Sequence, residues 1–218
     1  MSDLQQEQTT ATVSISKKNQ QLIIYLLLGG MIAAGAIFGY SELYQKPREA
    51  KAADAMFMAE KYFANDSSNF VLNGDGQSKG VLYIIKEFSG TKAANLAKYY
   101  AGISYFRMND FNKSIDYLKD FSTDAKQIQA VAYGTLGDAY SSLNKVDEAV
   151  SHYKKAGEYF PEDEAISSEY LFRAAAFLEL NNKTEEAIEL YTKIKNDYPK
   201  SEKGIMADKY INRLKIQP

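Results

Sequence analysis

The sequence predicts an all-α protein in which an N-terminal transmembrane helix is followed by a solenoid of antiparallel helix pairs and a C-terminal capping helix. The first observation behind this prediction is an uncharged stretch of 19 residues, Leu22 to Tyr40, which is long enough to cross a bilayer as a helix. The second is a set of small and aromatic residues that recurs at intervals of about 34 residues, the pattern of stacked helical hairpins.

The first 40 residues divide into a polar tail and an apolar span. Residues 1–21 are rich in Gln, Ser and Thr, a composition that buries too little apolar surface to fold, so we expect a disordered tail. Residues 22–40 would extend roughly 28 Å as a helix, close to the thickness of the hydrocarbon core. We interpret them as a membrane span, because a core helix of a repeat protein would carry a polar face.

Two properties of this span stay open at the sequence level. The run Ala34-Gly35-Ala36 resembles the small-residue site of a cleaved signal peptide, but the apolar stretch exceeds the ~7–15 residues that are usual for one. We favour an uncleaved signal anchor, with cleavage as the alternative. Basic residues flank both ends of the span, so the charge count does not fix the orientation.

Residues 41–94 are expected to form a membrane-proximal helix and a degenerate first hairpin. Pro47 should break the helix that leaves the membrane. Residues 65–77 are interpreted as a loop, and its run Asn73-Gly74-Asp75-Gly76 could offer oxygen ligands to calcium. The run lacks the order and the closing Glu of an EF-hand, and a turn is the preferred interpretation. Apolar residues at helical spacing predict a helix over Gly80 to Phe88.

The clearest hairpin covers residues 130–163. Its diagnostic residues are Tyr133, Leu136, Gly137, Tyr140, Ala149 and Tyr153. Two antiparallel helices approach closely only where small residues lie at the crossing, and Gly137 and Ala149 supply them. Tyr140 and Tyr153 fill the space beside that crossing. Asp147 is expected to cap the second helix.

This pattern resembles a tetratricopeptide repeat (TPR), with Tyr133 in place of the usual Trp. The resemblance extends along the chain and gives three units at 95–128, 130–163 and 168–201. The equivalent packing residues of the two flanking units are Gly102, Tyr105, Ala175, Ala187 and Tyr191. One hairpin cannot bury both of its faces, so the units must stack, and residues 202–218 should form a helix that caps the open end.

The composition leaves little material for catalysis. The chain has no Cys, which excludes disulfides, thiolate metal sites and thiol nucleophiles. The single histidine, His152, is expected to be a surface residue of a helix rather than a base or a ligand. A formal charge of -2 gives no indication of nucleic-acid binding. We therefore expect no enzyme activity, no metal and no cofactor.

In TPR proteins the first helix of each repeat lines a concave groove that binds other proteins. Carried over to this chain, the groove positions give Leu96, Tyr99, Ile103, Phe106, Arg107, Asp138, Ser141, Phe172 and Glu179. The apolar members favour a partner helix or an extended peptide. The alternative is that the first hairpin or the loop 66–77 covers them. The Lys and Asn that hold chaperone C-terminal carboxylates in other TPR domains are missing, so we do not expect that kind of binding.

The whole layout resembles the YfgM-type family, in which a polar tail and one membrane helix precede degenerate TPR units. The resemblance implies a protein of the bacterial inner membrane whose repeats lie on the periplasmic side. It also implies association with the Sec translocon and with periplasmic chaperones, as an ancillary factor in protein export or envelope assembly. The alternative is a structural subunit whose repeats pack permanently inside a larger membrane complex.

Overall fold

The computed structural model describes residues 17–216 of the chain. In this part of the chain all regular elements are helices, and the only pairing of extended backbone is a single bridge between Gly74 and Lys79. The chain divides into two compact units, Met1–Pro47 and Arg48–Pro218. The polar tail predicted for residues 1–21 lies outside the described residues up to residue 16. Residues 17–21 belong to the first helix.

The first unit contains the apolar helix α1 (Lys17–Tyr40) and the short π-helix η1 (Ser41–Gln45). By length and composition, the helical stretch that begins at Gln21 is able to cross a membrane, and none of its apolar window is buried. A core helix would bury one face, so this exposure argues against the core-helix interpretation. A signal sequence would satisfy the same test.

Pro47 does not break the helix, contrary to the sequence-based expectation. In η1 the N–H of Lys46 donates to the carbonyl of Ser41, five residues earlier, which is the wider π spacing. Pro47 has no N–H to donate. It lies just after η1, where the backbone hydrogen bonds change from the π spacing to the α spacing. The proline therefore lies in the first turn of α2, which continues to Ala64.

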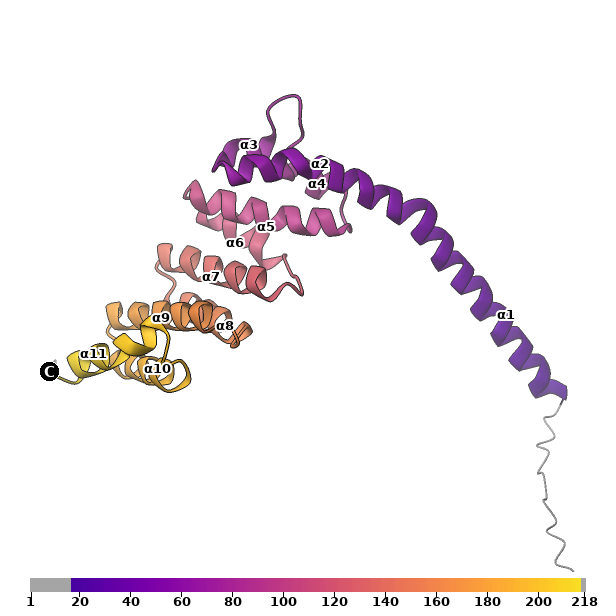
Figure 1. Ribbon diagram of the computed structural model, residues 1–218. Helices are drawn as coiled ribbons and strands as arrows, with labels where there is room; N and C mark the ends of the chain where they lie inside the picture. The colour runs from indigo at the N-terminus through magenta and orange to yellow at the C-terminus, as the bar shows by residue number, and fades with distance from the viewer. Residues whose placement is uncertain (1–16, 217–218) are drawn as a thin grey trace, which may run out of the picture. The chain divides into compact units, whose positions relative to one another are not determined.

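The second unit is a series of helices that begins with α2 and ends with α11. The helices are α2 (Lys46–Ala64), α3 (Ser68–Asn73), α4 (Val81–Glu87), α5 (Lys92–Arg107), α6 (Phe111–Lys119), α7 (Lys126–Ser142), α8 (Val146–Tyr159), α9 (Glu164–Leu180), α10 (Thr184–Asp197) and α11 (Glu202–Ile216). From α3 onward each helix packs against the next one in the chain, and Figure 1 shows the helix pairs stacked in chain order. The predicted all-α solenoid with a final single helix is confirmed.

An asparagine ends the first helix of each of the three repeated pairs. Asn109, Asn144 and Asn182 occupy the same repeat position and have φ values of 61°, 56° and 59°. Asn adopts this left-handed conformation more readily than other side chains with a Cβ. The residue at this position therefore turns the chain sharply, and the second helix of the pair starts within two residues.

The N-terminus of α8 differs from our expectation. Its N-cap residue is Lys145, which makes no side-chain cap, and Asp147 lies inside the first turn. A carboxylate there still interacts favourably with the helix dipole. The Asp147 carboxylate also accepts a hydrogen bond from Lys183 Nζ at 2.7 Å, which links α8 to the next pair.

Small residues lie where the paired helices meet. A Cβ atom added to Gly137 would lie 2.5 Å from Cδ1 of Tyr153, and one added to Gly102 would overlap the Leu118 side chain. The packing residues with fully or almost fully buried side chains are Leu136, Tyr140, Ala149, Tyr153, Ala175, Ala187 and Tyr191. Tyr105 and Tyr133 are half-buried. The close approach at these positions leaves no room for larger side chains.

Two departures from the expected helices matter for the site. The stretch 65–77, expected to be a loop, contains the short helix α3, whose Val71 and Leu72 are buried. Helix α6 has nine residues, whereas its counterparts α8 and α10 have 14 each. Residues 120–125 therefore form a loop between α6 and α7.

Candidate protein-binding face

The first helices of successive pairs, α5, α7 and α9, lie next to one another, and α11 lies against α9. We call the side of these helices that carries the predicted groove positions the inner face. It consists of Leu96, Tyr99, Ile103, Phe106, Arg107, Asp138, Ser141, Phe172 and Glu179. The structure places these residues on neighbouring helices of one domain. The end of the face at α5 is aromatic, whereas the part toward α9 and α11 carries ionic contacts.

The end of α2 covers the aromatic part of the inner face. The ring of Phe63 lies 6.4 Å from the ring of Tyr99, and the Arg107 guanidinium lies 4.4 Å above Phe63. Arg107 also forms an ion pair of 2.9 Å with Asp66, just beyond α2. On its other side, Tyr99 packs 5.3 Å from Phe121. The first hairpin therefore covers this end of the inner face. This was the alternative to an open groove that the sequence left possible.

The other apolar residues of α5 differ in accessibility. Ile103, predicted to line the groove, is only 9% exposed, so its side chain belongs to the packed interior and not to an open groove. Phe106 is half-buried, with its ring 5.6 Å from that of Phe111. Leu96 is half-buried and lines a cavity at the start of α5. Of these residues, only Leu96 lines one of the larger cavities.

The middle of the inner face carries a chain of ionic hydrogen bonds. Arg173 Nη1 lies 3.0 Å from Asp138 Oδ2, and Arg173 Nε donates to Glu169 at 2.9 Å. The Tyr153 hydroxyl donates to Asp138 Oδ1 at 2.7 Å, while Lys203 pairs with Glu169 at 3.3 Å. Burial, reinforced by the Asp138 charge, raises the pKa of the Tyr153 hydroxyl. The network joins helices α7, α8, α9 and α11.

A second ionic contact joins α9 and α11 at the C-terminal end of the inner face. Both oxygens of Glu179 accept from Arg213 Nη2, at 2.5 and 2.7 Å, and the Tyr191 hydroxyl donates to Glu179 at 3.3 Å. Phe172 lies beside them, with its ring 5.4 Å from Tyr191 and 4.9 Å from Tyr210. Glu179 and Phe172 are therefore engaged in contacts within the domain.

The middle of helix α7 offers little free surface. A Cβ at Gly134 would collide with the ring of Tyr170, which fills that position from α9. Burial raises the pKa of Tyr170 to about 12. Ser141 is half-buried beside the network, where its hydroxyl interacts with Tyr153.

Sequence reasoning missed the cations of the inner face, Arg173, Lys203 and Arg213. A usable signal was present in the spacing. Arg173 follows Asp138 by 35 residues, and Arg213 follows Glu179 by 34. Opposite charges one repeat length apart on first helices face each other when the repeats stack. Each of these cations already binds a carboxylate of this chain. They therefore do not form a preformed clamp for a partner's carboxylate.

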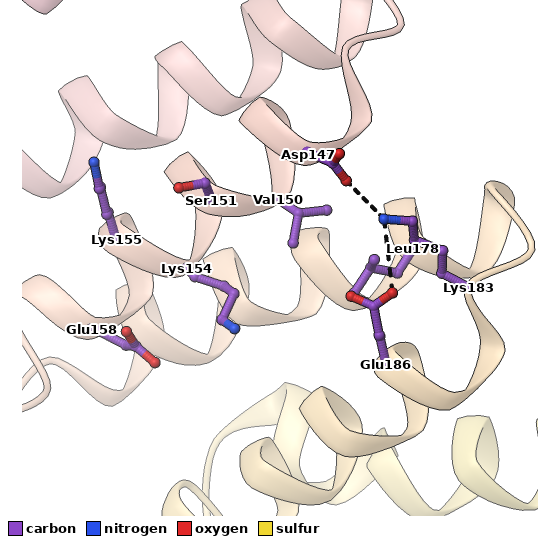
Figure 2. A pocket seen from close by; sticks show the side chains of 9 residues that line it. All are labelled: Asp147, Val150, Ser151, Lys154, Lys155, Glu158, Leu178, Lys183 and Glu186. Carbon is purple, nitrogen blue, oxygen red and sulfur yellow. Dashed lines mark hydrogen bonds and ion pairs between the residues drawn. The ribbon is translucent and has the colours of Figure 1, made fainter.

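Two cavities lie beside the stacked helices. One of about 630 Å³ lies at the start of α5 and α7 and includes Leu96, Phe121 and Ile128. Another, of about 380 Å³, lies on the second helices α8 and α10. Figure 2 shows that Lys183 in this cavity lies between Asp147 and Glu186, and its distances to their oxygens are 2.7 and 3.8 Å. The charged side chains that line this cavity therefore partly neutralise one another.

Among residues 17–216, His, Asp and Glu side chains form no group of three that could hold a metal ion. Asp75, in the run considered for calcium, is bound within its own loop. It accepts from the Tyr62 hydroxyl at 2.6 Å and from the N–H of Ser78 at 2.6 Å. These hydrogen bonds, led by that of Tyr62, lower the pKa of Asp75 to about 2. The carboxylate thus stabilises a turn.

His152 is not the surface residue that we expected. It is half-buried, and its ring stacks on Tyr140 with a centroid distance of 5.2 Å and an interplanar angle of 11°. Its Nδ1 atom is buried without a hydrogen-bond partner. Burial, followed by the charges of Lys155 and Lys119, lowers the pKa of His152 to about 4. The residue is a packed neutral aromatic ring.

Comparison with known proteins agrees with this architecture. Residues 98–204, just under half of the chain, match the family model of soluble NSF attachment protein, SNAP. Among solved structures, the chain is similar to a Podosopora anserina protein described as a kinesin light chain with nearly identical TPR-like repeats. The TM-score is 0.52, and the match covers 76% of this chain and 86% of that one. This chain has a TPR-like helical-repeat fold.

The two chains are 12% identical, so the likeness concerns the fold alone. No curated protein sequence matches this chain. The TPR-like fold nevertheless fixes the type of surface available. Stacked helix pairs of this kind present extended faces that typically bind other proteins.

Proposed function

We propose that this protein is a membrane-anchored interaction module, which residues 22–40 hold in a bilayer while its TPR-like repeats bind other proteins. The observation that carries the proposal is the joining of two features in one chain. One is an apolar helix of which no part is buried. The other is a stack of helical repeats, an architecture whose common use is protein binding. In this proposal the protein is a scaffold and not an enzyme.

The finer proposal concerns place and process. We place the protein in the bacterial inner membrane, with the repeats on the periplasmic side, as an ancillary factor in protein export or envelope protein assembly. Its partners would then include the Sec translocon or periplasmic chaperones. Support comes from the layout of tail, span and degenerate repeats, which resembles the YfgM-type family.

One observation favours a second candidate, a structural subunit packed permanently in a larger membrane complex. Much of the inner face is engaged within the domain, through Arg173 with Asp138 and Arg213 with Glu179. A face with few free polar groups suits a permanent apolar contact better than a rapidly exchanging one.

Anchoring and orientation can be tested on the full chain in its native membranes. An uncleaved anchor predicts that alkaline carbonate leaves the protein in the membrane and that its mass includes residues 1–40. A periplasmic repeat domain predicts that protease added to spheroplasts digests it. Release by carbonate, a mass without residues 1–36, or full protection from protease would each contradict the corresponding part of the proposal.

The two candidates differ in their response to changes on the inner face. Arg107 is exposed there, and Ser142 is an exposed residue of α7. The variant Arg107→Glu with Ser142→Arg should reduce co-purification of a reversible partner at least tenfold. A charge-matched control, Lys209→Glu with Asn212→Arg on exposed positions of α11, should retain the partner. A partner that stays stoichiometric with both variants would favour the structural subunit.

A further inference from the structure

We infer that the cavity at the start of α5 and α7 binds apolar side chains of an extended juxtamembrane segment of another protein in the same membrane. We call this cavity the α5–α7 pocket, and its apolar lining consists of Leu96, Phe121 and Ile128. The inference deepens the proposed function and rests on its membrane anchoring.

The α5–α7 pocket exists because one helix is short. Helix α6 ends at Lys119 after nine residues, more than one turn shorter than α8 and α10. The loop 120–125 replaces the missing turn, and at repeat position 32 this unit has Lys126 where the next two have Pro161 and Pro199. Stacking of the repeats does not require this irregularity, since the neighbouring pairs stack without it. At about 630 Å³, the pocket is large enough for one or two side chains.

The exposed surface of the pocket is mainly apolar, and two hydrogen bonds within the domain engage polar groups of its lining. Asn95 Nδ2 donates to the carbonyl of Ser122 at 2.7 Å, and the N–H of Thr123 donates to Gln129 Oε1 at 2.8 Å. These bonds hold the loop in place from both sides. Ile128 remains 38% exposed. A fixed and mainly apolar recess favours aliphatic or aromatic side chains over ions or phosphate.

The chain connects this pocket closely to the apolar span. Both oxygens of Glu49 accept hydrogen bonds from the start of α5, from the N–H of Lys92 at 2.9 Å and of Ala93 at 3.1 Å. Glu49 follows Tyr40 by nine residues, a length that reaches at most about 30 Å even when fully extended. Lys92 is part of the pocket rim. The covalent connection therefore sets an upper limit on the distance between the start of α5 and the end of the proposed span, so that segments of other proteins in the same membrane are within reach.

Photo-crosslinking in native membranes tests the inference on the full chain. A photoreactive phenylalanine derivative replaces Ile128, and a matched control replaces Ile205, which is 72% exposed on α11. We expect at least tenfold more adduct with integral membrane proteins from position 128. Mass spectrometry of the cross-linked peptides should place the adducts in apolar segments within about 15 residues of a membrane span. Adducts that map to soluble proteins, or to a second copy of this chain, would overturn the inference.

A variant of the pocket supplies the second readout. Leu96→Asn, which places an amide in the apolar recess, should lower the yield from position 128 at least fivefold, while Ile205→Asn should leave it unchanged. An unchanged yield with Leu96→Asn contradicts the inference. A third photoreactive position, the exposed Ser142 on α7 next to Ser141 of the inner face, separates the two proposals. Adducts from 142 with none from 128 would refute only the pocket, whereas none from either would also refute protein binding by this face.

Discussion

The Arg173 guanidinium lies 3.0 Å from the carboxylate of Asp138 and joins the first helices of two successive repeats. The same carboxylate accepts a hydrogen bond from Tyr153 on α8, so three helices meet at one acidic group. A half-exposed ion pair on its own contributes only about 0.2–1 kcal/mol. The shared acceptor makes the contact part of a network, whose members should not act independently.

A double-mutant cycle on Arg173→Gln and Asp138→Asn should reveal this coupling. We expect each single variant to lower the free energy of unfolding by about 1 kcal/mol and the double variant by less than the sum, with a coupling of about 0.5–1 kcal/mol. Urea unfolding of the protein in detergent micelles, followed by near-ultraviolet circular dichroism, measures the four values. The coupling should shrink in 1 M salt. Additive effects at low salt would show that the contact does not stabilise the stack.

Gly137 provides a test of the helix crossing. Alanine forms helices more readily than glycine by about 1 kcal/mol, so Gly137→Ala would be stabilising on a free helix surface. Here the added Cβ would lie 2.5 Å from Tyr153, and the forced shift should cost about 1–3 kcal/mol. We expect a net loss of stability in urea unfolding. The control Ser142→Ala, at an exposed position of the same helix, should be neutral or slightly stabilising.

The fold was predictable because its determinants recur in sequence. Gly137 and Ala149 lie at a helix crossing that only small residues permit, and their spacing is visible without coordinates. The turn residues Asn109, Asn144 and Asn182 also recur at one repeat position. The short α6 was not predictable, because no proline or glycine marks its end at Lys119. Its length depends on tertiary packing that local sequence does not encode.

The candidate site was predictable only in outline. Placing Tyr99 and Phe172 on one face required only the repeat register, whereas knowing that Phe63 and Tyr210 contact them required the packed structure. These contacts come from elements that lie outside the regular repeats. Arg173 was missed although its spacing from Asp138 is informative, because single-repeat reasoning does not compare charges between units.

Replacing two buried serines by alanine should change the stability of the protein in opposite directions. The Ser114 hydroxyl is fully buried without a hydrogen-bond partner, at the repeat position where the next two units have Ala149 and Ala187. Ser114→Ala removes an unsatisfied polar group and should stabilise the protein by about 1 kcal/mol. Ser167, equally buried, donates to the carbonyl of Phe160 at 2.9 Å, and Ser167→Ala should instead cost about 1 kcal/mol. Thermal unfolding of both variants compares the signs, and a loss of stability in both would contradict the assignment of Ser114.

His152 should make stability depend on pH. Its pKa is about 4 in the folded chain and about 6.5 in an unfolded one, so the unfolded state binds more protons between these values. The free energy of unfolding should therefore be fully retained above about pH 6.5 and should fall as the pH drops toward 4. Lys155 and Lys119 both disfavour the charged ring, while Glu148 acts in the opposite sense.

The variant His152→Phe isolates this contribution, because it keeps an aromatic ring against Tyr140 and removes the titrating group. Between pH 7 and pH 4.5 the wild-type protein should lose about 1–2 kcal/mol more stability than the variant, a figure reduced for the solvent screening of a half-buried ring. Carboxylates contribute the same background to both proteins, so the difference between the two curves reports on His152. Urea unfolding at four pH values in this range measures it. Parallel curves would show that the imidazole is freely protonated in the folded chain and that its stacking on Tyr140 does not hold it neutral.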